Sequence, residues 1–255
     1  MVTAFRHKEG VTPQVRPRLS LEATRPPLVV AHRGACRLAP ENSVAAVDLA
    51  IRLGADMVEF DVRRTRDGAL VVHHDATLGA CRLADLTYDE LGRVAGHTPD
   101  RLEAILRVAA GRVLLDVELK EEGDEEAVVE VLARYTSPAD LIVTSFSARS
   151  VAAVKRLGVR AGLLCEWEAD REAVFARAHG CGADLIAPHV RLADDAFVRQ
   201  ASLRDVPLLV WTVNDARRIG RYLARPSVMG VITDVPDRAL AVRDAVGGQP
   251  TVTMR

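Results

Sequence analysis

Residues 56–75 read DMVEFDVRRTRDGALVVHHD, and this stretch decides how the rest of the chain is interpreted. Asp56–Val62 is a short apolar run that is typical of a buried strand. A second apolar run, Ala69–His73, begins after Gly68, whereas two parallel neighbours need a crossover of about a dozen residues or more. The dipeptide Asp67-Gly68 between the runs is a strong turn signal. The sequence therefore predicts a β-hairpin, and we do not count its return arm as a strand of the main sheet.

Outside the hairpin, short apolar runs alternate with amphipathic segments along the chain. The runs, rich in Val, Ile and Leu, predict buried parallel strands at Leu28–Ala31, Asp56–Val62, Arg112–Leu119, Asp140–Ser145, Arg160–Cys165, Asp184–Pro188, Pro207–Val213 and Met229–Thr233. Helices are expected between and after them at Ser43–Leu53, Arg101–Ala110, Glu125–Tyr135, Ala148–Leu157, Asp170–Ala178, Asp194–Leu203, Asp215–Leu223 and Pro236–Val246. We expect Asn42 to cap the first helix and Gly54 to end it.

This alternation is the pattern of a (β/α)₈ TIM barrel with a β-hairpin extension after its second strand. An open, doubly wound α/β sheet is the alternative, but the G-x-G-x-x-G turn that such folds carry does not follow the first strand. We expect a single barrel domain over residues 28–247, a polar N-terminal extension over residues 1–27 and a short C-terminal tail over residues 248–255.

Composition excludes several classes of function. The formal net charge is -1 and there is no clustered basic stripe in the expected barrel, so nucleic acid is not an expected partner. The longest apolar stretches fall far short of the ~20 residues of a transmembrane span. The four cysteines show no C-x-x-C spacing, which favours a reducing, cytoplasmic location. Cys36 lies beside the turn after the first strand, and we interpret it as a loop residue rather than a nucleophile.

Acidic residues gather at the carboxyl ends of the expected strands, which is the catalytic face of a TIM barrel. Glu59 and Asp61 are two positions apart on one strand and so point to the same face, and Glu118 and Lys120 repeat this spacing on the next. Three inward carboxylates would repel one another unless a cation relieved them. An all-oxygen set favours Mg²⁺ or Ca²⁺, so we predict one divalent cation on Glu59, Asp61 and Glu118.

Two histidines flank this acidic group. His32 ends the first strand and His74 ends the hairpin arm, and imidazoles suit an acid–base pair because they titrate near neutral pH. The adjacent His73 should point to the opposite face and is the alternative partner. Arg33 and Lys120 are cations at the same mouth and are expected to bind a phosphate. His32 should sit on the rigid rim, whereas His74 should sit on a more adjustable arm.

Taken together, these segments resemble the glycerophosphodiester phosphodiesterase family. The resemblance is carried by His32-Arg33-Gly34, Pro40-Glu41-Asn42-Ser43, Val58–Val62, Thr65–Gly68, Val72–Asp75, Glu118-Leu119-Lys120, Ser145-Phe146, Trp211–Asn214 and Thr233-Asp234. It implies hydrolysis of a glycerophosphodiester to an alcohol and glycerol 3-phosphate, with the metal, acid–base and phosphate roles given above. It also implies that Phe146 and Trp211 form an apolar wall for the substrate, and His189 is a further candidate at the mouth.

Other readings of the same site remain open at this point. A lysophospholipase D-like enzyme would act on a lysophospholipid, and an apolar apron around residues 76–100 would favour it. A phosphoinositide-cleaving barrel also uses acid–base histidines, but the E-x-D and E-L-K pairs favour the diesterase family. A non-catalytic phosphate-binding barrel belongs to a different class. Two routes of hydrolysis also remain open, direct attack by water and attack by the substrate's own 2-hydroxyl, which gives a cyclic phosphate first.

Overall fold

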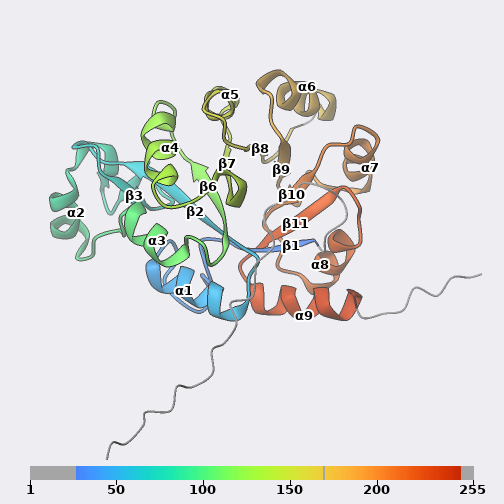
Figure 1. Ribbon diagram of the computed structural model, residues 1–255, viewed down its shortest axis with the longest axis horizontal. Helices are drawn as coiled ribbons and strands as arrows, with labels where there is room; N and C mark the ends of the chain where they lie inside the picture. The colour runs from blue at the N-terminus through green and yellow to red at the C-terminus, as the bar shows by residue number, and fades with distance from the viewer. Residues whose placement is uncertain (1–26, 169, 248–255) are drawn as a thin grey trace, which may run out of the picture.

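The computed structural model describes residues 27–168 and 170–247, and these form a barrel of parallel strands surrounded by helices (Figure 1). Within the described residues the barrel strands are β1 Leu28–Ala31, β2 Met57–Arg64, β6 Leu114–Leu119, β7 Leu141–Ser145, β8 Ala161–Cys165, β9 Leu185–Pro188, β10 Leu208–Val210 and β11 Val228–Thr233. Each strand pairs in parallel with its neighbours, and β1 pairs with both β11 and β2, which closes the barrel. The predicted (β/α)₈ architecture is therefore confirmed. Apart from Pro27, the expected N-terminal extension and C-terminal tail lie outside the described residues.

Helices follow the strands as the sequence predicts. They are α1 Val44–Leu53, α3 Leu102–Ala109, α4 Glu125–Ala133, α5 Ala148–Arg156, α6 Arg171–Cys181, α7 Asp195–Leu203, α8 Ala216–Leu223 and α9 Pro236–Gly247. In the described part of the chain, no helix has both the length and the apolar character that crossing a membrane requires.

The start of α1 differs from the prediction at its cap. Gly54 ends the helix in the left-handed conformation, as expected, but the N-cap is Ser43 rather than Asn42. The Ser43 hydroxyl accepts a hydrogen bond from the backbone N–H of Ala46, because the extended backbone at Ser43 directs its side chain at the first turn. Asn42 has a left-handed backbone, with φ 55°, and its side chain is used elsewhere.

The hairpin is confirmed. Strand β3 (Leu70–Val72) runs antiparallel to β2, with Val62 opposite Val72, and lies outside the barrel. Strand β3 pairs with β2 alone and is not part of the closed ring of strands. The chain after β3 therefore continues on the outside of the barrel (Figure 1).

A small unit after the hairpin was not predicted. It comprises β4 (Thr77–Leu78), β5 (Cys81–Arg82), the 3₁₀ helix η1 (Leu83–Asp85) and the α-helix α2 (Tyr88–Ala95). The missed signal was the spacing of Thr87 and Glu90, which form a capping box at the start of α2. Leu78, Leu83 and Leu91 pack together with Val71 as a separate small core.

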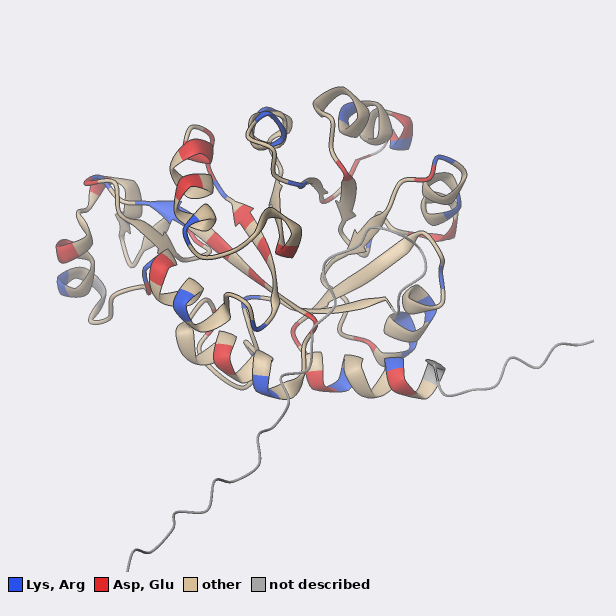
Figure 2. Ribbon diagram, in the orientation of Figure 1, with Lys and Arg blue, Asp and Glu red and all other residues tan. Residues whose placement is uncertain are grey.

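Side-chain alternation divides the barrel into an apolar floor and an acidic mouth. A separate cluster of buried apolar side chains from the barrel strands comprises Val30, Met57, Leu114, Ile142, Leu164, Leu185, Ala187, Leu209 and Ile232. On β2, Val58 and Phe60 belong to the layer packed under the helices, so Glu59 and Asp61 point inward. Figure 2 shows acidic bands on the neighbouring strands β2 and β6. Charge therefore lies at one end of an otherwise apolar interior.

Candidate active site

The three predicted metal ligands meet at the carboxyl ends of β2 and β6. The strand register places Asp61 opposite Glu118, and Glu59 lies on the same face of β2 as Asp61. All three side chains are buried, and each offers a carboxylate oxygen within 4.8 Å of the others. One barrel strand pairing thus brings together side chains that are far apart in the sequence.

A fourth carboxylate, Asp116, lies one position deeper on the same face of β6 and was not predicted as part of the site. It is opposite Glu59 in the register, fully buried, and accepts a hydrogen bond of 2.8 Å from the Thr144 hydroxyl. Burial raises the pKa of Asp116 to about 7. The sequence could have indicated this, because Asp116 lies two positions before Glu118 on one strand and so points to the same face.

Charges around the acidic group are unevenly compensated. The Lys120 ammonium nitrogen lies 2.6 Å from Glu118 Oε1 and 2.9 Å from Asp61 Oδ1, and Arg33 Nε lies 3.4 Å from Asp61 Oδ2. Burial alone would raise the pKa of Asp61, but Lys120 and Arg33 outweigh it and lower that pKa to about 2. Burial and the charge of Asp61 raise the pKa of Glu118 to about 7. Burial, Asp61 and Glu118 also raise the pKa of Glu59 well above its ordinary value.

The loop from β1 to α1 folds over the carboxylates. The backbone N–H of Arg33 donates to Glu59 Oε2 at 2.8 Å, and Arg33 also pairs with Glu41 at 2.9 Å. Gly34 allows the tight turn, because its φ is +79° and a Cβ there would lie 2.6 Å from a backbone atom of Ala46. The loop is therefore held against both α1 and the acidic group.

Asn42 is a site residue that the sequence analysis did not assign to the site. Its Nδ2 donates to Asp61 Oδ2 at 2.7 Å, and its Oδ1 accepts from the backbone N–H of Asp61 at 3.1 Å. The side chain therefore fixes the orientation of one predicted metal ligand. Its membership in the Pro40–Ser43 segment of the family resemblance was the signal that pointed to it.

His32 faces the acidic group through one ring nitrogen and Asp234 through the other. His32 Nδ1 donates to Asp234 Oδ1 at 2.6 Å, and His32 Nε2 lies 4.0 Å from Glu59 Oε2. Asn214 donates to the other Asp234 oxygen at 2.7 Å. Although burial opposes it, the hydrogen bond and charge of His32 lower the pKa of Asp234 to about 2. Asp234 thus holds the ring in place, a role that the Thr233-Asp234 segment did not reveal by itself.

His74 follows β3 and borders the same cavity as Glu118 and Lys120. Its Nδ1 donates to Asp75 Oδ1 at 2.7 Å, and burial together with the charge of Lys120 lowers the pKa of His74. The Arg63 guanidinium donates to the His74 carbonyl oxygen from Nε at 2.9 Å and from a terminal nitrogen at 2.7 Å. These two hydrogen bonds from Arg63 hold the main chain at His74 in addition to the pairing of the hairpin. The ring of His73 instead bonds the Thr77 carbonyl oxygen at 3.2 Å.

A cavity of about 470 Å³ opens beside His74 and is bordered by Glu118, Lys120 and Phe146. Phe146 is 45% exposed and contacts Trp211 edge-on, with ring centroids 5.7 Å apart. The ring centroid of His189 lies 4.9 Å from that of the same indole, so His189 lies beside this aromatic pair. An aromatic wall therefore stands beside the charged mouth.

Comparison with known proteins adds independent evidence. The model of the glycerophosphoryl diester phosphodiesterase family matches residues 32–238, which include each of the acidic, basic, histidine and aromatic site residues described above. The chain belongs to the glycerophosphoryl diester phosphodiesterase family. The family resemblance and the expectation of a phosphodiesterase that hydrolyses glycerophosphodiesters are thereby confirmed.

Individual members of the glycerophosphoryl diester phosphodiesterase family are similar over nearly their full length. A glycerophosphodiester phosphodiesterase of Caldanaerobacter subterraneus is 29% identical over 247 residues, covering 82% of this chain and 95% of the relative. The crystal structure of a Thermotoga maritima glycerophosphodiester phosphodiesterase has a TM-score of 0.73 at 26% identity and covers 85% of this chain and 97% of that one. An Oleispira antarctica phosphodiesterase, solved in complex with the product sn-glycerol-3-phosphate, has a TM-score of 0.73 at 26% identity and covers 86% and 97%.

Proposed function

We propose that the protein hydrolyses glycerophosphodiesters to an alcohol and glycerol 3-phosphate, using one divalent cation and a histidine acid–base pair. The observation that carries this proposal is the buried cluster of Glu59, Asp61 and Glu118 between two histidine contacts. His32 Nε2 lies 4.0 Å from Glu59, and His74 borders the same cavity as Glu118. The product bound to the Oleispira antarctica phosphodiesterase supports glycerol 3-phosphate as the product here.

The acidic cluster fits a hard divalent cation. Glu59 Oε1 is buried and has no hydrogen-bond partner in the described structure, so a polar ligand atom is left available. Burial and the neighbouring charge of Asp61 raise the pKa of Glu118 to about 7 despite the contact with Lys120. A cation on Glu59, Asp61 and Glu118 would remove that repulsion, and the all-oxygen set favours Mg²⁺ or Ca²⁺. When bound, such a cation supplies Lewis-acid polarisation of a phosphoryl oxygen.

Arg33 and Lys120 are the groups proposed to bind the substrate phosphate. Both side chains are mostly buried beside Asp61, and both already compensate carboxylate charge. A phosphodiester bound at this mouth would have its anionic oxygens close to both cations. The attraction between them is stronger here than in bulk water, because the site is partly shielded from solvent. Phe146 and Trp211 are proposed to contact the apolar part of the glycerol or alcohol portion.

The two histidines have different surroundings, which suits different roles. The anionic Asp234 behind His32 stabilises the imidazolium that forms when Nε2 accepts a proton, so we assign His32 as the base. The lowered pKa of His74 makes its protonated form a stronger acid, and its position at the cavity suits protonation of the departing alcohol oxygen. The attacking group that His32 deprotonates is either water or the 2-hydroxyl of the substrate, and the second route gives a cyclic phosphate first.

Turnover of glycerophosphocholine in defined metals tests this proposal. We expect EDTA to abolish activity and Mg²⁺ or Ca²⁺ to restore it. We expect His32→Ala and His74→Ala each to lower kcat by roughly 10²–10⁴-fold, the usual contribution of general acid–base catalysis. His73→Ala is the matched control and should retain activity. Near wild-type turnover by His74→Ala, or loss confined to His73→Ala, would refute the assignment.

Substrate size separates the proposal from its alternatives. Leu78, Leu83 and Leu91 are buried in their own small core, so these side chains do not provide an apolar apron for an acyl chain. We therefore expect glycerophosphocholine to be turned over faster than lysophosphatidylcholine. The reverse order would favour the lysophospholipase D-like reading, and metal binding without turnover of either would favour a phosphate-binding barrel.

The single barrel domain over residues 28–247 and a cytoplasmic location are also part of the proposal. The continuous ring of strand pairings from β1 to β11 supports one folding unit. Limited proteolysis should leave residues 28–247 intact as one fragment, and cell fractionation should recover the protein with the cytoplasm.

A further inference from the structure

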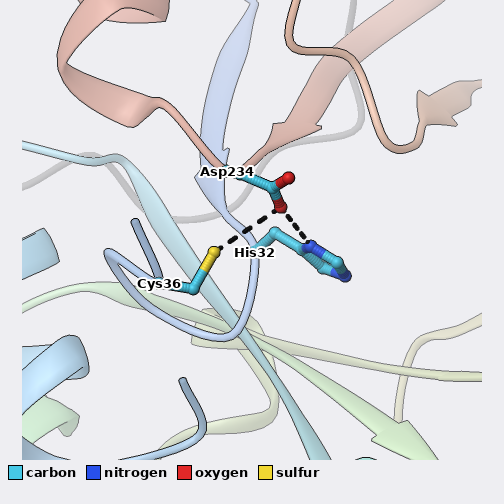
Figure 3. A group of neighbouring side chains, drawn as sticks. All are labelled: His32, Cys36 and Asp234. Carbon is cyan, nitrogen blue, oxygen red and sulfur yellow. Dashed lines mark hydrogen bonds and ion pairs between the residues drawn. The ribbon is translucent and has the colours of Figure 1, made fainter. Parts of the chain in front are cut away.

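A second group of metal-binding side chains lies at the carboxyl ends of β1 and β11. His32 Nδ1 is 2.6 Å from Asp234 Oδ1, and Cys36 Sγ is 3.5 Å from the same oxygen. The three possible ligand atoms all lie within 4.8 Å of one another. Figure 3 shows the imidazole and the thiol converging on one oxygen of Asp234. The proposed hydrolysis uses the other nitrogen of His32 and gives Cys36 no role.

The donor set differs in kind from the acidic cluster. Nitrogen, sulfur and one carboxylate oxygen are ligands of Zn²⁺ and related thiophilic cations, whereas Mg²⁺ and Ca²⁺ prefer oxygen. A tetrahedral zinc with Zn–O of about 2.0 Å and Zn–S of about 2.3 Å holds its oxygen and sulfur ligands about 3.5 Å apart. The observed separation of Cys36 Sγ and Asp234 Oδ1 is 3.5 Å. The His32–Asp234 pair would have to open from 2.6 Å to about 3.3 Å.

The surroundings hold Asp234 ready for this role. Asn214 donates to Asp234 Oδ2 at 2.7 Å, and Arg37 lies 3.6 Å from that same oxygen. Oδ1 is thereby left directed at both His32 and Cys36. Such outer contacts are the means by which proteins orient metal-ligating groups.

We propose that His32, Cys36 and Asp234 form an inhibitory site for Zn²⁺ or another thiophilic divalent cation, distinct from the acidic cluster. On binding, the Cys36 thiol releases its proton to solvent and the thiolate coordinates the cation. The proton on His32 Nδ1 moves to Nε2, and Nδ1 becomes a ligand. Nε2 then carries a hydrogen and can no longer accept a proton from the attacking group. The inhibitory half of this inference rests on the proposed function, whereas the binding half does not.

Without a bound metal, the Cys36 thiol is unreactive. Burial and the charge of Asp234 raise the pKa of Cys36 to about 12, so the side chain stays protonated and is a poor nucleophile. A bound cation reverses this effect, because a coordinating thiol loses its proton. Cys36 is therefore expected to form a thiolate only when it coordinates a metal.

Binding of Cd²⁺ to the full chain in excess Mg²⁺ tests the site without an activity assay. We expect the ultraviolet thiolate-to-cadmium absorption band in the wild type at one equivalent. Cys36→Ser should lose the band, since serine keeps the hydrogen bond to Asp234 but is not a thiolate. Cys81→Ser, which removes another partly exposed thiol, is the matched control and should keep it. A band of wild-type size in Cys36→Ser would overturn the proposal.

Inhibition is measured separately, with Zn²⁺ in excess Mg²⁺ on glycerophosphocholine turnover. We expect Cys36→Ser to need at least ten-fold more Zn²⁺ for half inhibition than the wild type or Cys81→Ser, since the loss of even an outer-shell partner of a ligand typically lowers metal affinity about 10–100-fold. Equal sensitivity of all three proteins would refute the inhibitory half while leaving the diesterase proposal intact. If the wild type turned over no diester, the cadmium band would still decide whether the site exists.

Discussion

Replacement of Asn42 by alanine tests how the site is held together without removing a group that carries the proposed chemistry. Asn42 is 5% exposed and makes two hydrogen bonds to Asp61, one to the carboxylate at 2.7 Å and one from the backbone N–H at 3.1 Å. Its backbone is left-handed, with φ 55°. The substitution therefore removes both bonds and also places alanine in a conformation that L-residues avoid.

The expected cost in stability follows from the two lost hydrogen bonds and the left-handed backbone. A hydrogen bond to a charged group contributes about 1.5–3 kcal/mol, and a buried N–H left without a partner costs about 1–3 kcal/mol. Allowing for partial rehydration, we expect Asn42→Ala to lower the free energy of unfolding by about 3–5 kcal/mol. Asn42→Gly should be less destabilised than Asn42→Ala by about 1 kcal/mol, because glycine tolerates the left-handed backbone.

Urea unfolding followed by tryptophan fluorescence measures these differences. Ser43→Ala is the matched neighbouring control, since it removes only the helix cap and should cost about 1 kcal/mol. A free energy of unfolding for Asn42→Ala within about 0.5 kcal/mol of the wild type, the range of ordinary surface substitutions, would contradict this prediction. Equal stability of the alanine and glycine variants would contradict the backbone part of the argument alone.

Three further predictions concern charge, packing and positioning. The folded pKa of Glu118, about 7, exceeds its ordinary value of 4.5, so its contribution to the stability of metal-free protein is complete below pH 4.5 and is lost as pH rises through 7. Thermal unfolding should accordingly show that Mg²⁺ or Ca²⁺ stabilises the protein more at pH 7.5 than at pH 5. Gly34→Ala should destabilise by about 2–4 kcal/mol in urea unfolding, because it combines a left-handed φ with overpacking against α1. Arg63→Ala should lower kcat more than it raises KM, since Arg63 positions His74 and is not proposed to bind the substrate phosphate.

Distinct results would contradict each of these predictions. Metal stabilisation that is the same at both pH values would show that Glu118 is not a ligand with a raised pKa. A Gly34→Ala variant as stable as the wild type would mean that the turn can relax away from α1. A change in KM alone for Arg63→Ala, or full rescue of kcat by an uncharged Arg63→Met, would show that its hydrogen bonds do not orient His74.

Local patterns in the sequence determined the barrel and the direction of its acidic side chains. The period of two along a strand puts Glu59 and Asp61 on one face, and the short Arg63–Gly68 connection permits only a hairpin. Both rules act over a few residues, so they needed no knowledge of the fold. The unit containing α2 was missed because its helix is short and its apolar residues serve a separate small core rather than the barrel.

The partners of the site residues were decided only by the tertiary structure. Asp234 lies 202 positions from His32 and reaches it because β1 and β11 pair when the barrel closes. Asn42 bonds Asp61 rather than capping α1, since the loop turns left-handed over the acidic group. Strand periodicity predicts which face a side chain takes, whereas its contacts depend on register and closure between segments distant in sequence. The sequence therefore determined which groups enter the mouth, and the closed barrel decided which of them hold one another in place.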